Sequence, residues 1–390
     1  MIDTQEIIQQ YKNEFGHKPV WLSRAPGRVN LIGEHTDYNG GLVFPAAINR
    51  EMKMAAGPRS DRKFCIYSTN FKQRVEFQPT DFQDVQPNHP WVNYFFGVID
   101  GFRQRGFVMP GLNVVVSGDV PLGAGLSSSA AYEVCAATLL NHIFRAGLAA
   151  KDIALLAQEA EHSRFVGVRC GIMDQFISAL GQANKALKLD CFSLSYELIP
   201  FNSNKASIVI INSMKKRGLV DSEYNRRRQE CEEGLETLKK LDSAPFKTLR
   251  HVPMSVFEKY EDRLGVNVAK RVRHNLTENQ RVKDFGIALK TDNFDMAGQL
   301  LYDSHVSLRD DFQVSCKELD AIADLSSAIG GCFGCRMTGA GFGGCAVALV
   351  KPDAVDHFRE RLTQGYREAF NVTPDIYISK AESGAMIAIL

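Results

Sequence analysis

The sequence has almost no excess charge of either sign, because its 390 residues contain 46 lysines and arginines against 45 aspartates and glutamates, a formal net charge of +1. Proteins that bind DNA or RNA take much of their affinity from a broad basic surface, so no nucleic-acid partner is expected. Apolar stretches are short, and none reaches the roughly 20 residues needed to cross a membrane. The first 16 residues lack the features of a signal peptide. A membrane is therefore not an expected partner either.

Cysteine is scarce and follows no metal-binding or disulfide pattern. The nine cysteines are an odd number scattered along the chain, which favours reduced thiols and a cytoplasmic location. Cys332 and Cys335 form a CxxC pair, but no second such pair and no histidine pair accompanies them, so a structural zinc site is not expected. Internal repeats and low-complexity segments are also lacking, which excludes solenoid architectures.

What the sequence does contain is the composition of a globular protein, with 45% apolar and 23% charged residues. A chain of this length favours two domains with a cleft between them. Apolar residues at helical spacing predict helices, and short alternating or fully apolar runs predict strands. The predicted helices lie at 1–15, 91–105, within 127–180, over most of 222–326 and from about 353. The predicted strands lie within 20–77 and at 112–116, 186–189, 208–211, 335–339, 345–350 and 375–379.

These elements predict an α+β fold, with the domain boundary between residues 205 and 206. A glycine-rich loop, Pro121-Leu-Gly-Ala-Gly-Leu-Ser-Ser-Ser-Ala130, connects a predicted strand to a predicted helix. Its glycines allow close backbone approach, and the free amides at a helix start attract phosphate oxygens. The P-loop pattern fails because Ala124 stands in place of the lysine, and GxGxxG fails at Ser128.

This loop has two interpretations, a phosphate cradle or an ordinary serine-capped turn, and the residues taken alone support both equally. The triple serine is unusual for a cap, and a second glycine cluster runs from Thr338 to Gly344. Two such loops could close over one nucleotide, which favours the cradle.

A second chemical segment, from Ala25 to Asn39, gathers Arg28, Glu34, His35 and Asp37 within a few positions. Such side chains can donate and accept several hydrogen bonds to a polyol. The alternative is a metal bound by His35 and Asp37, but one histidine between carboxylates makes a poor transition-metal site. We therefore favour a polyol.

A third segment, Cys170-Gly-Ile-Met-Asp-Gln175, follows the acidic stretch Gln158-Glu-Ala-Glu161. Asp174 could act on a substrate hydroxyl, and a carboxylate upstream could bind Mg²⁺. The alternative is that Asp174 caps the helix that follows it, and the residues alone do not separate the two interpretations.

Three motifs in these segments resemble those of a known family. Residues 27–38 match the galactokinase signature GRxNLIGEHxDY at every defined position, residues 121–130 resemble the loop PxGxGLSSSA, and RMTGAGFGGC at 336–345 resembles a third motif. The sequence is thus similar to galactokinases of the GHMP kinase superfamily. The resemblance implies a two-domain fold with the active site in the cleft, in which residues 1–205 bind sugar and phosphates and 206–390 complete the site.

The resemblance also implies a reaction and its participants. ATP would phosphorylate the anomeric hydroxyl of D-galactose with the help of Mg²⁺, giving galactose 1-phosphate and ADP in the first step of the Leloir pathway. No obligate protein partner is implied. Asp174 would be the catalytic aspartate, and Arg28 would stabilise the transition state.

The remaining roles follow the motifs position by position. The sugar would be held by Glu34, His35, Thr36, Asp37, Gly171 and Tyr224. The phosphates would be held by Gly123, Ala124, Gly125, Leu126, Ser127, Ser128 and Ser129. Mg²⁺ would be bound by Ser129 and Glu161.

Two positions depart from the family pattern. Ala340 stands where galactokinases commonly have glycine, and the expected effect of its methyl group is small. The run from Glu161 to Asp174 is one residue longer than usual near Arg164, so Glu159 is an alternative metal ligand.

Two rival functions remain, a kinase for a related sugar such as N-acetylgalactosamine or arabinose and a catalytically silent sugar sensor. The complete run from Ser127 to Ala130, together with Arg28 and Asp174, favours an enzyme over a sensor.

Overall fold

The computed structural model describes residues 3–78, 86, 88–215 and 220–390. The helices are α1 Thr4–Phe15, α2 Pro90–Gln104, α3 Ser128–Ile143, α4 Ala150–His162, α5 Met173–Leu180, α6 Val220–Asp242, α7 Met254–Tyr260, α8 Val266–Lys290, α9 Phe294–Ser307, α10 Lys317–Ser327 and α11 Val355–Phe370. The strands are β1 Trp21–Asn30, β2 Leu42–Val43, β3 Pro45–Arg59, β4 Phe64–Ser68, β5 Gln73–Phe77, β6 Gly111–Gly118, β7 Lys185–Asp190, β8 Tyr196–Pro200, β9 Ser207–Asn212, β10 Cys332–Thr338, β11 Cys345–Val350, β12 Asp375–Ser379 and β13 Met386–Ile389. Short helical turns include η1 Asp37–Asn39 and η4 Leu308–Phe312.

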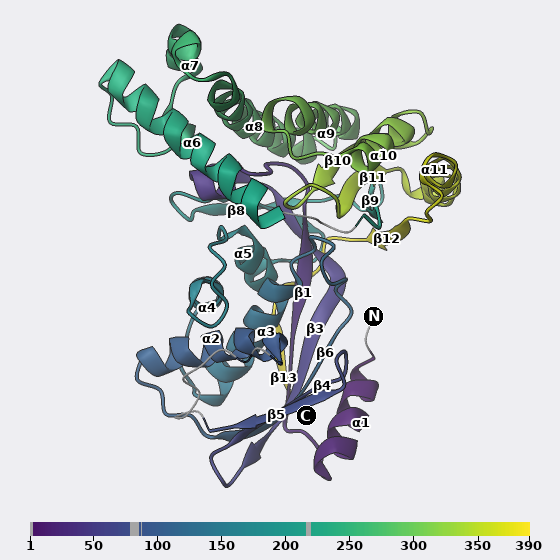
Figure 1. Cartoon of the computed structure of the whole chain (residues 1–390). Coiled ribbons are helices and arrows are strands. Elements are labelled where there is room, and N and C mark those ends of the chain that lie inside the picture. Colours follow the sequence, from purple (N-terminus) through teal and green to yellow (C-terminus); the bar gives the residue numbers. More distant parts are fainter. Residues whose placement is uncertain (1–2, 79–85, 87, 216–219) are drawn as a thin grey trace.

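One half of the molecule is built on a six-stranded sheet in the order β13-β1-β3-β6-β4-β5. Helices α2 to α5 cover one face of this sheet, and α1 covers the other (Figure 1). Successive residues of a strand point to opposite faces of the sheet, so a strand that is apolar at every position supplies apolar side chains to both faces. Val114 and Val116 of β6 pack into the large core under the helices, whereas Val115 between them packs with Tyr11 of α1.

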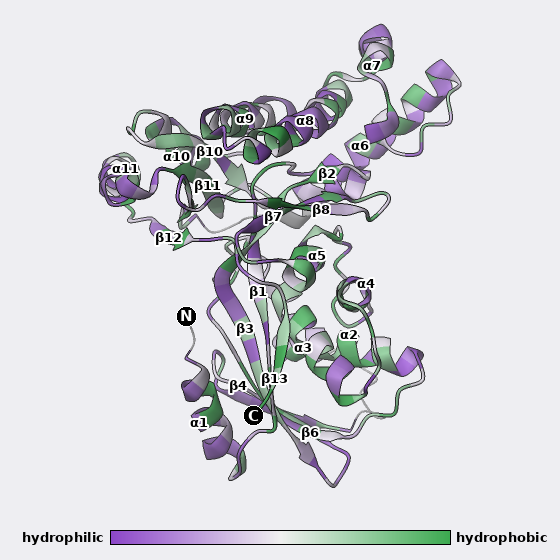
Figure 2. Ribbon diagram, turned by 180° about the vertical axis from the view of Figure 1, so that it is seen from behind, coloured by the Kyte–Doolittle hydropathy of each residue, from purple (hydrophilic) through white to green (hydrophobic). Residues whose placement is uncertain are grey.

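Helix α3 is the central helix of this half. It is buried along most of its length, from Ala130 to Leu140. Figure 2 shows it largely in the hydrophobic colour, unlike the surface helix α11, because a helix that is surrounded by protein has no solvent-facing side. The body of α3 is therefore fixed by packing, while its first residues, Ser128 and Ser129, are only partly buried and follow directly on the glycine-rich loop.

The other half contains a four-stranded sheet, β10-β11-β9-β12, packed against α9 and α10, and a three-stranded sheet, β2-β7-β8. A second core fills this half. The two halves are not separate bodies, because the main core continues into α8. There Phe285 meets Phe44 with their ring centroids 5.2 Å apart.

The structure confirms the predicted elements and adds two. Helix α1 ends at Gly16, whose φ of +77° suits glycine, and the predicted helices at 91–105, within 127–180 and in 222–326 are all present. Strand β8 and strand β13 were not predicted. After β12 the chain returns to the large sheet, where Ile389 of β13 pairs with Trp21 of β1. The boundary at residue 205 stays a prediction, and the last strand lies with the first half.

The nine cysteines are all free thiols, as their number and scatter predicted, and both members of the CxxC pair lie in β10. In the described part of the chain, no helix combines the length and the apolar character that a membrane span requires.

Helix α9 and strand β10 meet at two facing glycines, Gly298 and Gly334. A Cβ atom on Gly298 would overlap the carbonyl of Phe333, and one on Gly334 would overlap the carbonyl of Gly298. We expect Gly298→Ala to lower the free energy of unfolding by about 2 kcal/mol, because overpacking against backbone cannot be relieved by a rotamer change. Urea unfolding measures this change. Gly330→Ala is the control, since its Cβ meets no atom within 4 Å, and an equal loss in both variants would contradict the prediction.

Candidate active site

A cavity of about 270 Å³ lies where the two halves meet. Three segments from the first half contribute to its wall: the loop after β1, the glycine-rich loop before α3, and the start of α5. The second half contributes Tyr224 of α6 together with Gly339 and Ala340. Of the residues predicted to form the site, those lining the cavity are Arg28, Glu34, His35, Asp37, Gly123, Gly125, Leu126, Ser127, Ser128, Ser129, Gly171, Asp174 and Tyr224.

An ion pair between Arg28 and Asp174 forms one wall of the cavity. The guanidinium of Arg28 binds the carboxylate with both ends of its fork, with Nε to Oδ1 at 2.7 Å and Nη2 to Oδ2 at 2.9 Å. Its remaining arm, Nη1, donates to the carbonyl of Gly125 at 2.6 Å. Burial disfavours the charge of Arg28, but the carboxylates of Asp174 and Glu34 outweigh burial and raise the pKa of Arg28. Arg28 is therefore a fixed cation.

Asp174 has one open acceptor position. A carboxylate offers about four lone-pair sites. Oδ1 accepts one bond from Arg28, and Oδ2 accepts a second from Arg28 and a third from the hydroxyl of Ser127. The free lone pair on Oδ1 can take a proton or a hydrogen bond from a hydroxyl in the cavity. Asp174 lies in the first turn of α5, but the N-cap residue of this helix is Ile172, so the interpretation of Asp174 as the N-cap is wrong.

The glycine-rich loop turns its backbone toward the cavity. Gly123 and Gly125 have φ of +70° and +81°, which glycine adopts without strain. Ser127 precedes α3 with φ of +61° and makes no side-chain cap bond, because its hydroxyl binds Asp174. The amides at the start of α3 therefore have no serine cap. An unpaired helix start of this kind attracts anions.

Asp37 and Gly171 form a second wall. Asp37 opens the short turn η1, and a Cβ atom at position 171 would overlap its carboxylate, so any other residue there would displace the Asp37 side chain. Burial, and after it the charge of the neighbouring Asp174, raise the pKa of Asp37 from 3.8 to about 7. The group is thus poised to change charge near neutral pH when the cavity is empty.

Aromatic rings close the cavity on the side of the second half. The His35 ring lies 4.8 Å from that of Phe312 and 5.6 Å from that of Tyr224, between ring centroids. Its Nδ1 lies 2.9 Å from the hydroxyl of Tyr38. Burial lowers the pKa of His35 to about 3, so the imidazole is neutral. A neutral ring can donate one hydrogen bond and accept another.

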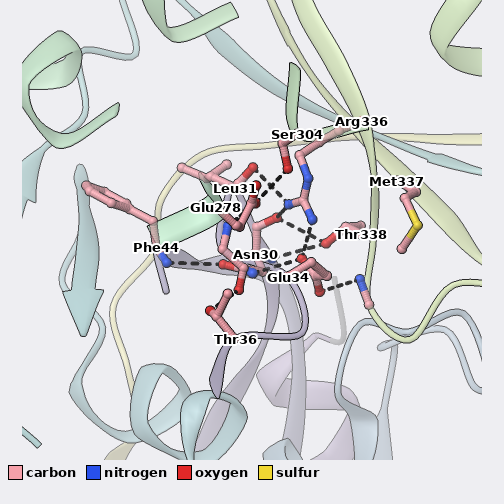
Figure 3. Close-up of polar contacts among 12 residues, drawn as sticks. Asn30, Leu31, Glu34, Thr36, Phe44, Glu278, Ser304, Arg336, Met337 and Thr338 are labelled. Atoms are coloured by element: carbon pink, nitrogen blue, oxygen red, sulfur yellow. Dashed lines mark hydrogen bonds and ion pairs between the residues drawn. The ribbon is translucent and has the colours of Figure 1, made fainter. Parts of the chain in front are cut away.

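Glu34 sits in a network of buried polar groups, drawn in Figure 3. Its Oε2 accepts from Asn30 at 2.8 Å and from Arg336 at 2.5 Å, and its Oε1 accepts from the amide of Gly339 at 2.7 Å. Arg336 and Gly339 come from the second half. In the sequence, both residues stand within a glycine motif, and no local pattern links position 336 to position 34.

Three predicted binding residues do not line the cavity: the metal-ligand candidate Glu161, which is described below, and the loop residues Thr36 and Ala124. The hydroxyl of Thr36 is buried and donates to the carbonyls of Gly33 and Leu42, so it holds the loop together. Ala124 points into the main core. Both were assigned because they lie between contact residues in a motif, but the turns of the loop direct their side chains away from the cavity.

The two carboxylates proposed for a metal lie in different surroundings. Glu159 is half exposed on the outer face of α4, where it pairs with Arg105 at 2.9 Å. Glu161 is buried, and its Oε2 accepts from Gln175 and from the thiol of Cys170. Burial raises the pKa of Glu161, while the nearby Ser129 hydroxyl lowers it.

A second acid lies beside Glu161. Glu133 of α3 is fully buried, and its Oε1 has no partner. Burial raises its pKa well above the usual value, and the charge of Glu161 adds to the shift. Two buried carboxyl groups beside Ser129 are the donor type that Mg²⁺ prefers, so these residues fit such an ion. Within the described ranges, no group of three or more His, Cys, Asp or Glu could hold a metal on its own.

The sequence analysis missed a second cavity, of about 350 Å³, on the other side of the glycine-rich loop. It shares Gly123, Ser128 and Ser129 with the first cavity. Its wall is mostly apolar and aromatic, with a few polar groups, and includes Met52, Asn70, Phe71, Trp91, Tyr94, Leu122 and Tyr132. These residues come from four separate stretches of chain. The spacing of Trp91 and Tyr94 on one helix face was the only signal available in the sequence.

Ala340 also lines the first cavity, where it departs from the family's glycine. Its neighbours Gly339 and Gly341 have φ of +83° and +82°, whereas Ala340 is not among the residues with positive φ. The backbone conformation at this position thus accepts a methyl group, in line with the small effect that was expected.

Comparisons with known proteins agree with this geometry. The GHMP kinase N-terminal domain matches residues 93–182, the GHMP kinase C-terminal domain matches 287–368, and the galactokinase galactose-binding signature matches 9–58. The fold and site define a GHMP kinase. Galactokinases from Clostridium perfringens and Roseiflexus are 42% and 40% identical, each over 98% of this chain and 99% and 97% of their own length. The chain belongs to the galactokinase family of ATP-dependent sugar kinases.

Solved structures give the same result. A galactokinase from Lactococcus lactis, crystallised with galactose, matches with a TM-score of 0.92 and 36% identity, over 98% of this chain and 99% of that one. The mevalonate kinase of Methanococcus jannaschii matches with a TM-score of 0.66 at 16% identity, which shows that the fold is shared.

The raised pKa of Asp37 predicts a pH effect on galactose phosphorylation. Ionised Asp37 only accepts hydrogen bonds, so sugar hydroxyls should bind it best above its pKa. We expect kcat/KM for galactose, which reports the free enzyme, to fall as the pH drops below about 7. His35 cannot cause this fall, because its pKa is about 3.

Asp37→Asn is the comparison variant, measured in the same buffers so that titration of ATP is common to both proteins. Its activity should be lower, and the step near pH 7 should be missing. Parallel profiles for the two proteins between pH 6 and 8 would show that Asp37 does not cause the effect.

Proposed function

We propose that the protein transfers the γ-phosphoryl group of ATP to the anomeric hydroxyl of D-galactose, giving galactose 1-phosphate and ADP, the first step of galactose catabolism. The observation that carries this proposal is the pair of Arg28 and Asp174, which faces a cavity bounded by polar residues on one side and by a helix start on the other. The cavity thus brings together a carboxylate that can accept a proton from a sugar hydroxyl, a helix start that can bind phosphate, and a fixed cation.

Asp174 acts on the nucleophile. The sugar hydroxyl donates to Oδ1, its oxygen forms a bond to the γ-phosphorus, and the bond from that phosphorus to the bridging oxygen of ADP breaks. The proton passes to Asp174 late in the step. A free aspartate is a weak base, with a pKa near 3.9, but a loose transition state bonds the nucleophile little and needs no strong base.

Arg28 supplies the charge for the transition state. It is held by three hydrogen bonds, so its guanidinium needs no reorganisation as negative charge spreads over the phosphoryl oxygens. The amides from Gly123 to Ser129 at the start of α3 bind the phosphates of ATP. Of these residues Ala124 contributes only its backbone.

The second cavity holds the adenosine end of ATP. Aromatic rings such as Trp91 and Tyr94 suit a flat base, and the shared wall at Gly123 and Ser128 leads from this cavity to the first. ATP would thus lie across the glycine-rich loop, with its base on one side and its γ-phosphate on the other.

Ser129 and Glu161 would hold Mg²⁺, which would supply positive charge to neutralise the phosphates of ATP. Mg²⁺ usually keeps several water ligands and is coordinated by substrate phosphates, so it needs only one or two protein carboxylates. The burial of Glu161 beside Ser129, and the ion pair that occupies Glu159, support Glu161 over Glu159.

The sugar is held by Glu34, His35, Asp37, Gly171 and Tyr224, while Thr36 holds the loop that carries them. The carboxylates and the neutral imidazole offer acceptors and a donor in fixed directions, which supports selectivity between sugars that differ in one hydroxyl. The free thiols support a reducing compartment, the cytoplasm.

The first test concerns Asp174. We expect Asp174→Asn to lower kcat by about 10²–10⁴-fold, the usual contribution of a proton acceptor, and to weaken galactose binding much less because Asn has the same size. A coupled assay of ADP release with galactose measures kcat, and calorimetry measures binding.

Arg28→Ala should also lower kcat sharply, and the double variant should lose much less than the product of the two losses. A near-normal kcat in Asp174→Asn would remove this residue from the mechanism.

The second test separates the two candidate metal ligands. Glu161→Gln should raise the Mg²⁺ concentration for half-maximal activity about tenfold or more, because an amide is a weaker ligand than a carboxylate. Glu159→Gln is the matched control, two residues away on the same helix, and should leave the Mg²⁺ dependence unchanged. The opposite pattern would assign the metal to Glu159.

A further inference from the structure

Arg336 is a buried cation that reaches from the second half of the molecule to the sugar-binding loop, Asn30 to Asp37. It lies on β10 and is fully buried. Its Nη1 donates to the carbonyls of Asn30 and Leu31 at 2.9 and 3.0 Å, and its Nη2 donates to Oε2 of Glu34 at 2.5 Å (Figure 3). One guanidinium thus binds the backbone of the loop and the carboxylate that the loop presents.

Strand geometry explains why this side chain points to the loop. Residues two apart on a strand share a face. Thr338 follows on the same face of β10, and its hydroxyl donates to the carbonyl of Asn30 at 3.1 Å. Met337, between them, faces the other way into the second core. The end of β10 is therefore shaped to receive the loop.

The hydrogen bonds of Glu34 leave one acceptor position of its carboxylate unoccupied. Oε2 accepts from Asn30 and Arg336, and Oε1 accepts from the amide of Gly339. With about four lone-pair sites on a carboxylate, one remains, on Oε1. Glu34 lines the first cavity. A sugar can therefore offer it one hydroxyl in one direction.

We propose that Arg336 is the positioning residue that fixes the carboxylate of Glu34, so that its single open acceptor selects one hydroxyl of the sugar. This inference rests on the proposed function, in which Glu34 is a sugar ligand. Arg336 does not touch the sugar. It acts through Glu34 and gives the second half of the molecule control over the selectivity of a loop in the first half.

Arginine is suited to this position, and lysine is not. The planar fork reaches two carbonyls and a carboxylate at once, whereas the single ammonium of lysine cannot occupy all of these positions. Arg336→Lys keeps the charge beside Glu34 but loses the fixed geometry. The substitution therefore tests orientation and not charge.

The experiment compares galactose with its 2-, 3-, 4- and 6-deoxy forms, by calorimetric binding and by kcat/KM. In the unchanged protein, one deoxy sugar should bind much more weakly than the other three, because it lacks the hydroxyl that pairs with the open acceptor of Glu34. In Arg336→Lys we expect galactose to bind about tenfold or more weakly, because a charge-assisted bond is misdirected. The penalty for that one deoxy sugar should shrink, and the KM for ATP should stay within about twofold.

Arg271→Lys is the matched control. Arg271 is also buried in the second half, and it also binds a glutamate, Glu230, and a backbone carbonyl, that of Asp311. Neither arginine lines the cavity, but Glu34, the partner of Arg336, does, whereas Glu230 does not. Both variants should lose thermal stability, and only Arg336→Lys should lose selectivity at one hydroxyl. An equal loss of affinity for galactose and all four deoxy sugars in Arg336→Lys would show a merely structural role and overturn the proposal.

A second pair of variants keeps the proposal testable if Arg336→Lys does not fold. Removing both partners of a buried ion pair together is better tolerated than removing one. Glu34→Gln and the double variant Glu34→Gln with Arg336→Gln should show the same relative penalties, within about twofold, for the four deoxy sugars, because Arg336 acts on selectivity through the carboxylate of Glu34. A further change in selectivity at one hydroxyl in the double variant would contradict the proposal.

The controls also separate this inference from the proposed function. If the unchanged protein does not bind and phosphorylate galactose, the proposed function fails before any variant is needed. If it does both and Arg336→Lys keeps its affinity and its selectivity, only the inference about Arg336 fails.

Discussion

The ion pair between Arg28 and Asp174 fixes the arrangement of the whole site. Arg28 comes from the end of β1, Asp174 from the first turn of α5, and the remaining bonds come from Gly125 and Ser127 of the glycine-rich loop. Three segments far apart in the sequence therefore meet at two side chains. A buried charge is tolerated only when it is paired and hydrogen-bonded, so this pairing constrains all three segments together. The pair that we propose performs the chemistry thus also holds the loop after β1, the glycine-rich loop and the start of α5 in one arrangement.

A second buried pair, Glu34 with Arg336, joins the two halves of the molecule on the sugar side. Replacing such a pair by apolar residues is often neutral or stabilising, so a buried salt bridge is weak evidence for a stabilising role. In this protein the pair fixes the direction in which the Glu34 carboxylate points. The pair holds a carboxylate at the wall of the cavity, while the main core extends into α8 and so contains side chains from both halves.

The sequence predicted those parts of the site that lie within single motifs. Arg28, Asp37 and Asp174 were singled out because each stands in a short segment rich in polar and charged side chains, and the resemblance to galactokinases then implied their roles. The cavity also depends on contacts that no local pattern contains. Arg336 reaches a partner 302 positions away, and the second cavity combines side chains from four stretches of chain. Thr36 illustrates a related limit, since the direction of a side chain in a loop depends on the turn around it, and its hydroxyl is directed to the carbonyls of Gly33 and Leu42.

Two residues at the site adopt a backbone conformation that their side chains disfavour. His35 and Ser127 both have φ of +61°, in the region where glycine is at ease. Such conformations cost of order 1 kcal/mol or more and persist only where the surroundings enforce them. His35 is enforced by its contacts with Phe312 and Tyr38, and Ser127 by its bond to Asp174. Glycine would relieve the strain at either position but would lose the ring or the hydroxyl. The strain is therefore the consequence of placing a functional side chain where the chain must turn.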